Sequence, residues 1–333
     1  MRVKVIWGSG EGNDTEVYRY SDDLLFVGDL ACDDYDWLVV YDEMPTGTVG
    51  TVKDGCERLR CPRARTILCT SEPVSIKSYS RAYTRQFGYL LTNRPQSAER
   101  HPGYRFGQGY YRCMNGRSFG ENVGFAVPGK TETVSAVCSA KSMRHTHHAQ
   151  RLRLVKAIAA AVPELVWYGH GVRELDRKNE AMDRFRYHIA VENHIAPGHW
   201  TEKFSDAILC ECLPFYAGDP EIGRLFPADS FIPIPIDDPE TAVRIIRSAV
   251  ASDAYERRRG AVLEAKRRIL TKYNFYAQVA AVIASHPQDA GRPGDGDGCV
   301  FARRILRKRS LAAMLEEGWL HFRKSVRIGR RNG

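Results

Sequence analysis

The sequence predicts an α/β protein with two domains, each built on a parallel sheet. Its 333 residues exceed the size at which a single hydrophobic core usually keeps growing. Short apolar strands alternate with helical segments along the chain, which is the pattern of strand–helix–strand units. Polar residues follow directly on several of these strands, where parallel sheets bind their ligands. The candidate site is therefore expected at the strand ends.

The composition is that of a globular protein, with 43% hydrophobic and 27% charged residues. No apolar run approaches the roughly 18 residues of a membrane span, and the N-terminus lacks the apolar core and cleavage site of a secretory signal. The nine cysteines are odd in number and spread over both halves, which favours reduced thiols over a disulfide framework. We therefore expect a cytoplasmic protein.

The net charge of +9 is concentrated at the C-terminus. Residues 301–333 hold ten Lys and Arg against two Glu, a local charge of +8, which leaves +1 for the first 300 residues. A nucleic-acid-binding protein would need a basic, aromatic-rich patch on a folded surface. Because the first 300 residues are nearly neutral, this class is kept only as a remote alternative. Apolar residues interleave with the basic ones at helical spacing. This pattern predicts a basic amphipathic tail on an anionic membrane surface, with a solvated or partner-bound tail as the alternative.

The first domain is predicted to span residues 1–129. Its strands are expected at 3–7, 37–41 and 66–70, with a helix at 76–87. Residues 103–129 are rich in Gly, Tyr and Arg without periodicity, which is typical of a loop that connects two domains.

The second domain, residues 130–286, shows clearer strand–helix repeats. Strands are expected at 133–139, 165–168, 187–192 and 213–216, and helices at 147–162, 201–211, 241–252, 255–272 and 275–283. The last helix is expected to pack back on the first domain. Residues 287–298 form a run of Gly, Pro and Asp that predicts a flexible linker to the tail at 299–333.

Candidate binding residues cluster between the strand at 187–192 and the helix at 201–211. The strand delivers Glu192 and Asn193 to its carboxyl end, and Thr201 is a plausible N-cap of the helix. Free backbone N–H groups at residues 202–204 would face an anion there, and Lys203 adds a positive charge. A solvated first helical turn is the alternative for Glu202 and Lys203.

The ordered motifs Y-H-I-A-V-E-N (187–193), W-T-E-K (200–203) and A-D-S-F-I (228–232) resemble the donor site of the α-1,3-fucosyltransferase family. The resemblance covers roughly residues 135–275. It implies a GT-B fold, with two Rossmann-like domains facing a cleft. It also implies that Asn193, Glu202 and Lys203 contact the donor, with Glu202 at the ribose and Lys203 at the diphosphate.

The resemblance extends to the helix at 147–162, where the family places an arginine against the donor phosphates. Arg151 matches this position best, and Arg153 is the alternate. His194 and His199 stand where the family has Ser and Tyr. Together with Glu192 and Trp200 they are candidates for the loop near the transferred sugar.

In the first domain, Thr70-Ser-Glu-Pro73 follows a strand and is similar to the family's cleft segment. This likeness assigns Glu72 as the general base that takes the proton of the acceptor hydroxyl. An ordinary surface glutamate at a strand end is the competing interpretation.

No metal site is predicted. His145, His147 and His148 have a spacing that can ligate zinc, but no Asp, Glu or Cys lies within about five residues, which favours a polar loop before a helix.

These features predict an inverting glycosyltransferase that moves L-fucose, or a related sugar, from a GDP-linked donor to a glycan hydroxyl in an α-1,3 linkage. The resemblance implies that protein cations replace a divalent metal, so no cofactor is expected. The acceptor would be a glycan. If that glycan is lipid-linked, the protein would act at the inner face of the membrane as a peripheral protein. A different nucleotide sugar and a non-catalytic glycan-binding relative are the alternatives.

Overall fold

A computed structural model describes residues 1–8, 17–70, 72–73, 76–107, 115–139, 147–286 and 298–329. The chain forms two compact units. Unit 1 comprises residues 1–111 and 274–333, and unit 2 comprises residues 112–273. The division therefore falls near residue 112 rather than 130, and the chain returns to unit 1 at residue 274 rather than ending unit 2 at 286.

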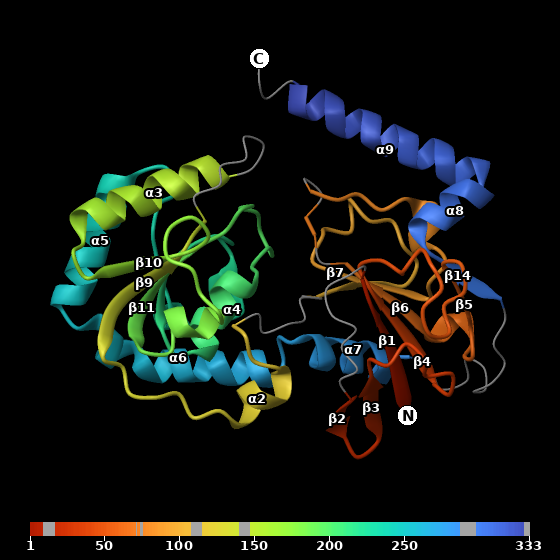
Figure 1. Ribbon diagram of the computed structural model, residues 1–333, viewed down its shortest axis with the longest axis horizontal. Helices are drawn as coiled ribbons and strands as arrows, with labels where there is room; N and C mark the ends of the chain where they lie inside the picture. Colours follow the sequence, from red (N-terminus) through yellow and green to blue (C-terminus); the bar gives the residue numbers. More distant parts are fainter. Residues whose placement is uncertain are drawn as a thin grey trace. The chain divides into compact units, whose positions relative to one another are not determined.

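Unit 2 is a five-stranded parallel sheet in the order β10-β9-β11-β12-β13 (Figure 1). Its strands are β9 (Glu132–Val137), β10 (Leu165–Tyr168), β11 (Phe185–Val191), β12 (Leu213–Ala217) and β13 (Ile232–Pro233). Its helices are α2 (Phe119–Gly124), α3 (His148–Ala161), α4 (Glu202–Leu209), α5 (Pro239–Ala251) and α6 (Ala254–Thr271), with short 3-10 turns η2 (Lys178–Ala181), η3 (Ile222–Arg224) and η4 (Ala228–Ser230). All sheet neighbours are parallel, as the alternation of strands and helices predicted.

Among the helices of unit 2, α4 and α5 begin at side-chain caps that the sequence carries. Thr201 accepts the backbone N–H of Lys203 at the start of α4, and Asp238 accepts that of Thr241 at the start of α5, where Pro239 occupies the first turn. Apolar faces of these helices join one buried cluster with the sheet, including Leu154, Phe204 and Ile246. This core fixes the strand ends that carry the polar residues.

Unit 1 is a seven-stranded sheet in the order β2-β3-β1-β4-β6-β7-β8. Its strands are β1 (Arg2–Trp7), β2 (Val17–Ser21), β3 (Leu24–Val27), β4 (Trp37–Tyr41), β6 (Thr66–Cys69), β7 (Tyr89–Thr92) and β8 (Tyr104–Phe106). Only the pairing of β2 with β3 is antiparallel among these neighbours. The unit also holds η1 (Arg63–Arg65), α1 (Arg81–Thr84) and α7 (Phe275–Ala284).

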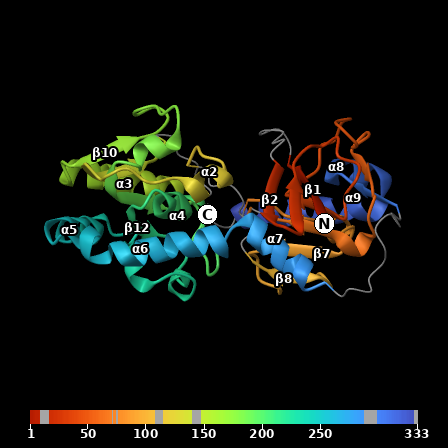
Figure 2. The same ribbon diagram turned by 90° about the horizontal axis from the view of Figure 1, so that it is seen from below.

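Helix α7 packs on the sheet of unit 1, which confirms that it returns to the first domain (Figure 2). The ring of Phe275 lies 4.9 Å from that of Trp7, and Tyr276 lies 4.9 Å from Phe26. Asn274 caps the helix by accepting the backbone N–H of Ala277.

Two predicted segments of unit 1 differ in the structure. The helix expected at 76–87 is the single turn α1, because residues 77–80 form no helix and Ser80, whose backbone is extended, accepts the N–H of Tyr83 as the N-cap. The connection expected at 103–129 contains β8 and α2, and α2 begins with a capping box between Ser118 and Glu121. The predicted linker lies outside the described residues except for Gly298.

The predicted tail is part of unit 1 over much of its length. It contains β14 (Cys299–Phe301), α8 (Arg303–Arg309) and α9 (Leu311–Gly329), and β14 pairs antiparallel with β5 (Cys56–Arg58). Val300 and Ala302 are fully buried in the core of this unit. The carboxylate of Glu316 accepts the backbone N–H groups of Arg81 and Ala82 at the start of α1, 2.8 and 3.0 Å away. The prediction of a separate tail from residue 299 is therefore corrected.

Candidate functional site

The strand order of unit 2 defines one crevice for a ligand. Numbered in chain order, the five strands lie 2-1-3-4-5 across the sheet. The neighbours β9 and β11 are therefore followed by connections that lead to opposite edges of the sheet. In open α/β sheets a ligand binds outside the carboxyl ends of the strands at such a switch point. Val137 ends β9 and Val191 ends β11, so the segments that follow these residues line the candidate site.

Arg151 spans this switch point. It lies in the first turn of α3, and its guanidinium donates to the backbone oxygen of Val137 and, at 3.1 Å, to Oδ1 of Asn193. The backbone oxygen of Asn193 accepts the N–H of His147, so β11 and the start of α3 hold each other in place. Within the described part of the chain, Arg151 has no carboxylate partner. Its positive charge is available to an anion.

The start of α4 supplies the second group of polar side chains. Lys203 Nζ lies 2.8 Å from Glu202 Oε1 and 3.6 Å from Glu192 Oε2. Glu192 is fully buried and accepts the N–H and the hydroxyl of Thr201, at 2.8 and 2.9 Å. Glu192 therefore anchors the first turn of α4 rather than facing solvent.

The predicted row of free backbone N–H groups is only partly present. The N–H of Lys203 donates to Thr201 Oγ1 at 3.3 Å, and that of Phe204 donates to the backbone oxygen of Thr201 at 3.1 Å. The cap uses these donors internally. An anion at this site would therefore have to be held by side-chain cations rather than by these two backbone N–H groups.

The ionisation of this cluster follows from burial and from its own pairs. Burial raises the pKa of Glu202, but the Lys203 and Lys178 ammonium groups outweigh it and lower that pKa to about 2. Burial likewise raises the pKa of Glu192, against the opposing effect of Lys203. Burial lowers the pKa of Lys203, but the two carboxylates raise it overall, so this lysine stays charged. Glu202 is consequently an ionised hydrogen-bond acceptor with 22% of its side chain exposed.

The predicted residues in the loop between β11 and α4 have different surroundings. The rings of His194 and His199 meet edge to face, with centroids 5.1 Å apart. Burial, and then the neighbouring His194, lower the pKa of His199 to about 4. Trp200 is 2% exposed and packs against Phe226, with ring centroids 5.2 Å apart, so it belongs to the core.

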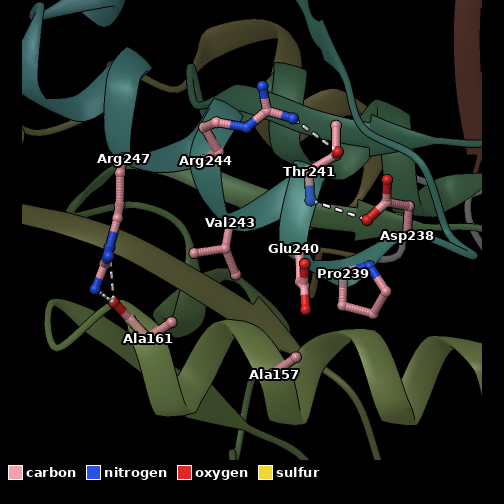
Figure 3. Close-up of a pocket in the computed structure, with 9 residues that line it drawn as sticks. All are labelled: Ala157, Ala161, Asp238, Pro239, Glu240, Thr241, Val243, Arg244 and Arg247. Carbon is pink, nitrogen blue, oxygen red and sulfur yellow. Dashed lines mark hydrogen bonds between the residues drawn. The ribbon is translucent and has the colours of Figure 1, made fainter.

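Arg153, the alternate to Arg151, lies on the other side of α3. Its Nη2 donates to the backbone oxygen of Asp237 at 3.4 Å, beside the start of α5. A surface cavity of about 550 Å³ lies between α3 and α5, lined by residues that include Ala157, Val243 and Arg247 (Figure 3). None of the predicted site residues lines this cavity. The geometry favours Arg151 for the switch point.

Glu72 lies in unit 1, three residues beyond the end of β6 and at the carboxyl edge of that sheet. It is half-buried. Its backbone oxygen accepts two hydrogen bonds from Arg94, at 3.0 and 2.6 Å. Glu43, another carboxylate of this edge, is paired with Lys77 at 2.8 Å.

Several charged residues near these sites gave no sequence signal. Lys178 in η2 pairs with the buried carboxylate of Asp206 at 2.6 Å and acts on Glu202 from there. Asp206 follows Glu202 by four residues on α4, so helical spacing could have linked the two acids. Arg94 lies in the loop after β7 and Lys178 in η2, and no local sequence pattern marks their contacts with Glu72 and Asp206.

Among the described residues, no group of three or more His, Cys, Asp or Glu side chains is placed to hold a metal ion. His145 lies outside the described residues. No helix in the described part of the chain is long and apolar enough to cross a bilayer.

Residues 127–248 match the family model described as glycosyltransferase family 10 (fucosyltransferase), C-terminal. A search of curated proteins found no match. Among solved structures, an α1,3-fucosyltransferase with GDP-fucose is 14% identical, with a TM-score of 0.45, over 82% of this chain and 92% of that one. The HepE protein of Anabaena, in complex with UDP and glucose, is 12% identical, with a TM-score of 0.46, over 75% and 78%. A glycosyltransferase from Rickettsia africae is 7% identical, with a TM-score of 0.44, over 76% of both chains.

The parallel sheets, the cationic switch point and the family match together define a glycosyltransferase. Residues 127–248 match the model of glycosyltransferase family 10, the fucosyltransferases, which confirms the predicted family resemblance over this segment. The two Rossmann-like units likewise agree with the predicted GT-B fold class.

Proposed function

We propose that the protein transfers L-fucose, or a related sugar, from a GDP-linked donor to a hydroxyl of a glycan, with inversion at the sugar carbon and in an α-1,3 linkage. The observation that carries the proposal is Arg151. Its charge lies at the switch point without a carboxylate partner in the described chain, beside Asn193 and near the Lys203 cluster. A fixed guanidinium binds diphosphate oxygens in a bidentate manner. The fucosyltransferase description of the matched family supports fucose as the sugar.

In the proposed reaction, Arg151 and Lys203 stabilise the charge that develops on the leaving diphosphate. The ionised Glu202 accepts hydrogen bonds from the ribose hydroxyls. Glu72 takes the proton of the acceptor hydroxyl as its oxygen attacks the sugar carbon from the face opposite the leaving group. The protein cations perform the role that a divalent metal has in other transferases, so we propose that no cofactor is required.

The donor is tested by calorimetry with GDP, UDP and CDP, followed by a transfer assay with the sugar of the nucleotide that binds, with and without EDTA. We expect GDP to bind most tightly, GDP-fucose to be consumed with a glycan acceptor, and EDTA to have no effect. Tighter binding of UDP or CDP would favour a different nucleotide sugar. Glycan binding without any turnover would identify a non-catalytic relative.

We also propose that α9 places the enzyme on an anionic membrane surface, peripheral to the inner face, where the acceptor would be a lipid-linked glycan. Leu311, Leu315, Trp319 and Phe322 are 68%, 63%, 58% and 60% exposed, and their spacing puts them on one face of α9. The basic residues of segment 301–333 supply the charge complementary to anionic lipid, each contributing about 1 kcal/mol near the surface.

Because β14 and α8 belong to the fold of unit 1, substitution tests this proposal better than truncation. Trp319→Ser with Phe322→Ser should lose sedimentation with phosphatidylserine vesicles, whereas Phe106→Ser removes an equally exposed ring, at 59%, from β8 and should not. Raised salt should release the parent protein. Equal sedimentation of parent and double variant would refute membrane contact through this face.

A further inference from the structure

Arg94 connects two loops at the carboxyl edge of the sheet in unit 1. It lies two residues beyond the end of β7, and its side chain is 3% exposed. Nε and Nη2 donate to the backbone oxygen of Glu72, at 3.0 and 2.6 Å. Nη2 also donates to the backbone oxygen of Lys77 at 2.7 Å. One guanidinium therefore holds the loop after β6 at two points five residues apart.

The guanidinium is itself held from several sides. Its Nη1 donates to Glu99 Oε1 at 2.6 Å, and its central carbon lies 4.7 Å from the centre of the Tyr79 ring. The backbone of Arg94 is fixed as well, because its N–H donates to Thr92 Oγ1 and its oxygen accepts the hydroxyl of Tyr104. A side chain restrained in this way transmits its own position to the loop that it holds.

The charge of Arg94 is matched by Glu99 rather than by Glu72. This distinction matters for catalysis, since an unpaired cation beside a general base weakens it as a proton acceptor. Paired with Glu99, Arg94 offers the loop directed hydrogen bonds without an excess charge. The Lys77 end of the loop is also held through its own side chain, which lies 2.6 Å from Asp42 and 2.8 Å from Glu43.

We propose that Arg94 is a positioning residue for sugar transfer, which fixes the backbone of Glu72 so that its carboxylate meets the acceptor hydroxyl. The inference rests on the proposed function, in which Glu72 is the general base. It assigns to Arg94 a contribution to turnover and none to donor binding, because the guanidinium of Arg94 donates to Glu72, Lys77 and Glu99 and, among the described residues, to none of the proposed donor residues.

A double-mutant cycle tests the proposal. Arg94→Lys keeps a positive charge beside Glu99, but one ammonium nitrogen cannot reproduce the fork that reaches Glu99, Glu72 and Lys77 together. We expect kcat to fall about 10²-fold, the cost of a misplaced catalytic group, with GDP affinity unchanged. Glu72→Gln should lower kcat by about 10²- to 10⁴-fold. In that background, Arg94→Lys should cost no more than about two-fold, because the base through which it acts is gone.

Arg105→Lys is the matched control. Arg105 also stacks on a tyrosine, 4.9 Å from the Tyr89 ring, and donates to a backbone oxygen, but it holds none of the described residues of the loop after β6. Its kcat should equal that of the parent. If Arg94→Lys does not fold, Arg94→Gln with Glu99→Gln removes both charges together and should show the same loss of kcat.

The outcomes separate this inference from the proposed function. An unchanged kcat for Arg94→Lys, or an equal loss in both backgrounds, overturns the positioning role, while a lowered kcat for Glu72→Gln still supports the proposed base. A Glu72→Gln enzyme with parental kcat removes the base assignment and the inference with it.

Discussion

Replacing Arg151 tests the donor site directly. Arg151→Met removes the guanidinium but keeps a side chain of similar length along α3. In the described chain it leaves no carboxylate unpaired, because the partners of Arg151 are the oxygens of Val137 and Asn193. The loss of two hydrogen bonds to neutral oxygens should lower the free energy of unfolding by about 1–2 kcal/mol. The variant should therefore stay folded.

The effect on binding should be larger than the effect on stability. Hydrogen bonds to a charged group contribute about 1.5–3 kcal/mol, which corresponds to an increase in the Kd for GDP of about 10- to 10²-fold. Arg151→Lys keeps the charge but loses bidentate geometry, so its Kd should lie between those of parent and Met variant.

Titration calorimetry with two ligands locates the contact. Guanosine shares the base and ribose of GDP but has no phosphate, so Arg151→Met should weaken GDP binding and leave guanosine binding unchanged. Arg153→Met is the control, since Arg153 donates to the Asp237 backbone beside α5. An Arg151→Met protein that binds GDP like the parent, or that loses GDP and guanosine equally, would refute the assignment of Arg151 to the diphosphate.

Two further predictions concern stability. Burial lowers the pKa of His188 to about 3, so between that value and about pH 6.5 the unfolded chain binds one more proton here, and stability falls as the pH falls. Between pH 7 and pH 5, the free energy of unfolding in urea should fall by about 2 kcal/mol more for the parent than for His188→Gln. An equal fall in both proteins would contradict burial of a neutral imidazole. Glu316→Gln weakens the acceptor at the start of α1 and should lower the free energy of unfolding by about 1 kcal/mol. Unchanged unfolding in urea would mean that α9 does not stabilise α1.

The sequence by itself determined the parallel strands of unit 2 and the start of α4. Apolar runs of the right length mark β9, β11 and β12, and a threonine cap followed by an amphipathic run marks α4. These signals act between residues a few positions apart, so they can be read without knowledge of the fold. The same locality explains why the residues around Asn193 and Lys203 could be named as site candidates from the sequence alone.

The orientation of individual site residues was decided only by the tertiary structure. The sequence favoured Arg151 over Arg153 only by its likeness to the family, whereas the placement of α3 against its sheet brings Arg151 to the end of β9 and Arg153 to Asp237. Glu192 and Trp200 are buried by the elements that close over them, so the first anchors α4 and the second fills the core.

Contacts between distant parts of the chain decided that the C-terminal segment is part of unit 1 rather than a separate tail. Its composition of basic and apolar residues predicted a tail, but β14 pairs with β5 more than two hundred residues earlier, and Glu316 caps α1. The contacts of Arg94 across two loops have the same character. Such pairings are selected by burial and hydrogen bonding over the whole unit, and no pattern within either segment encodes them.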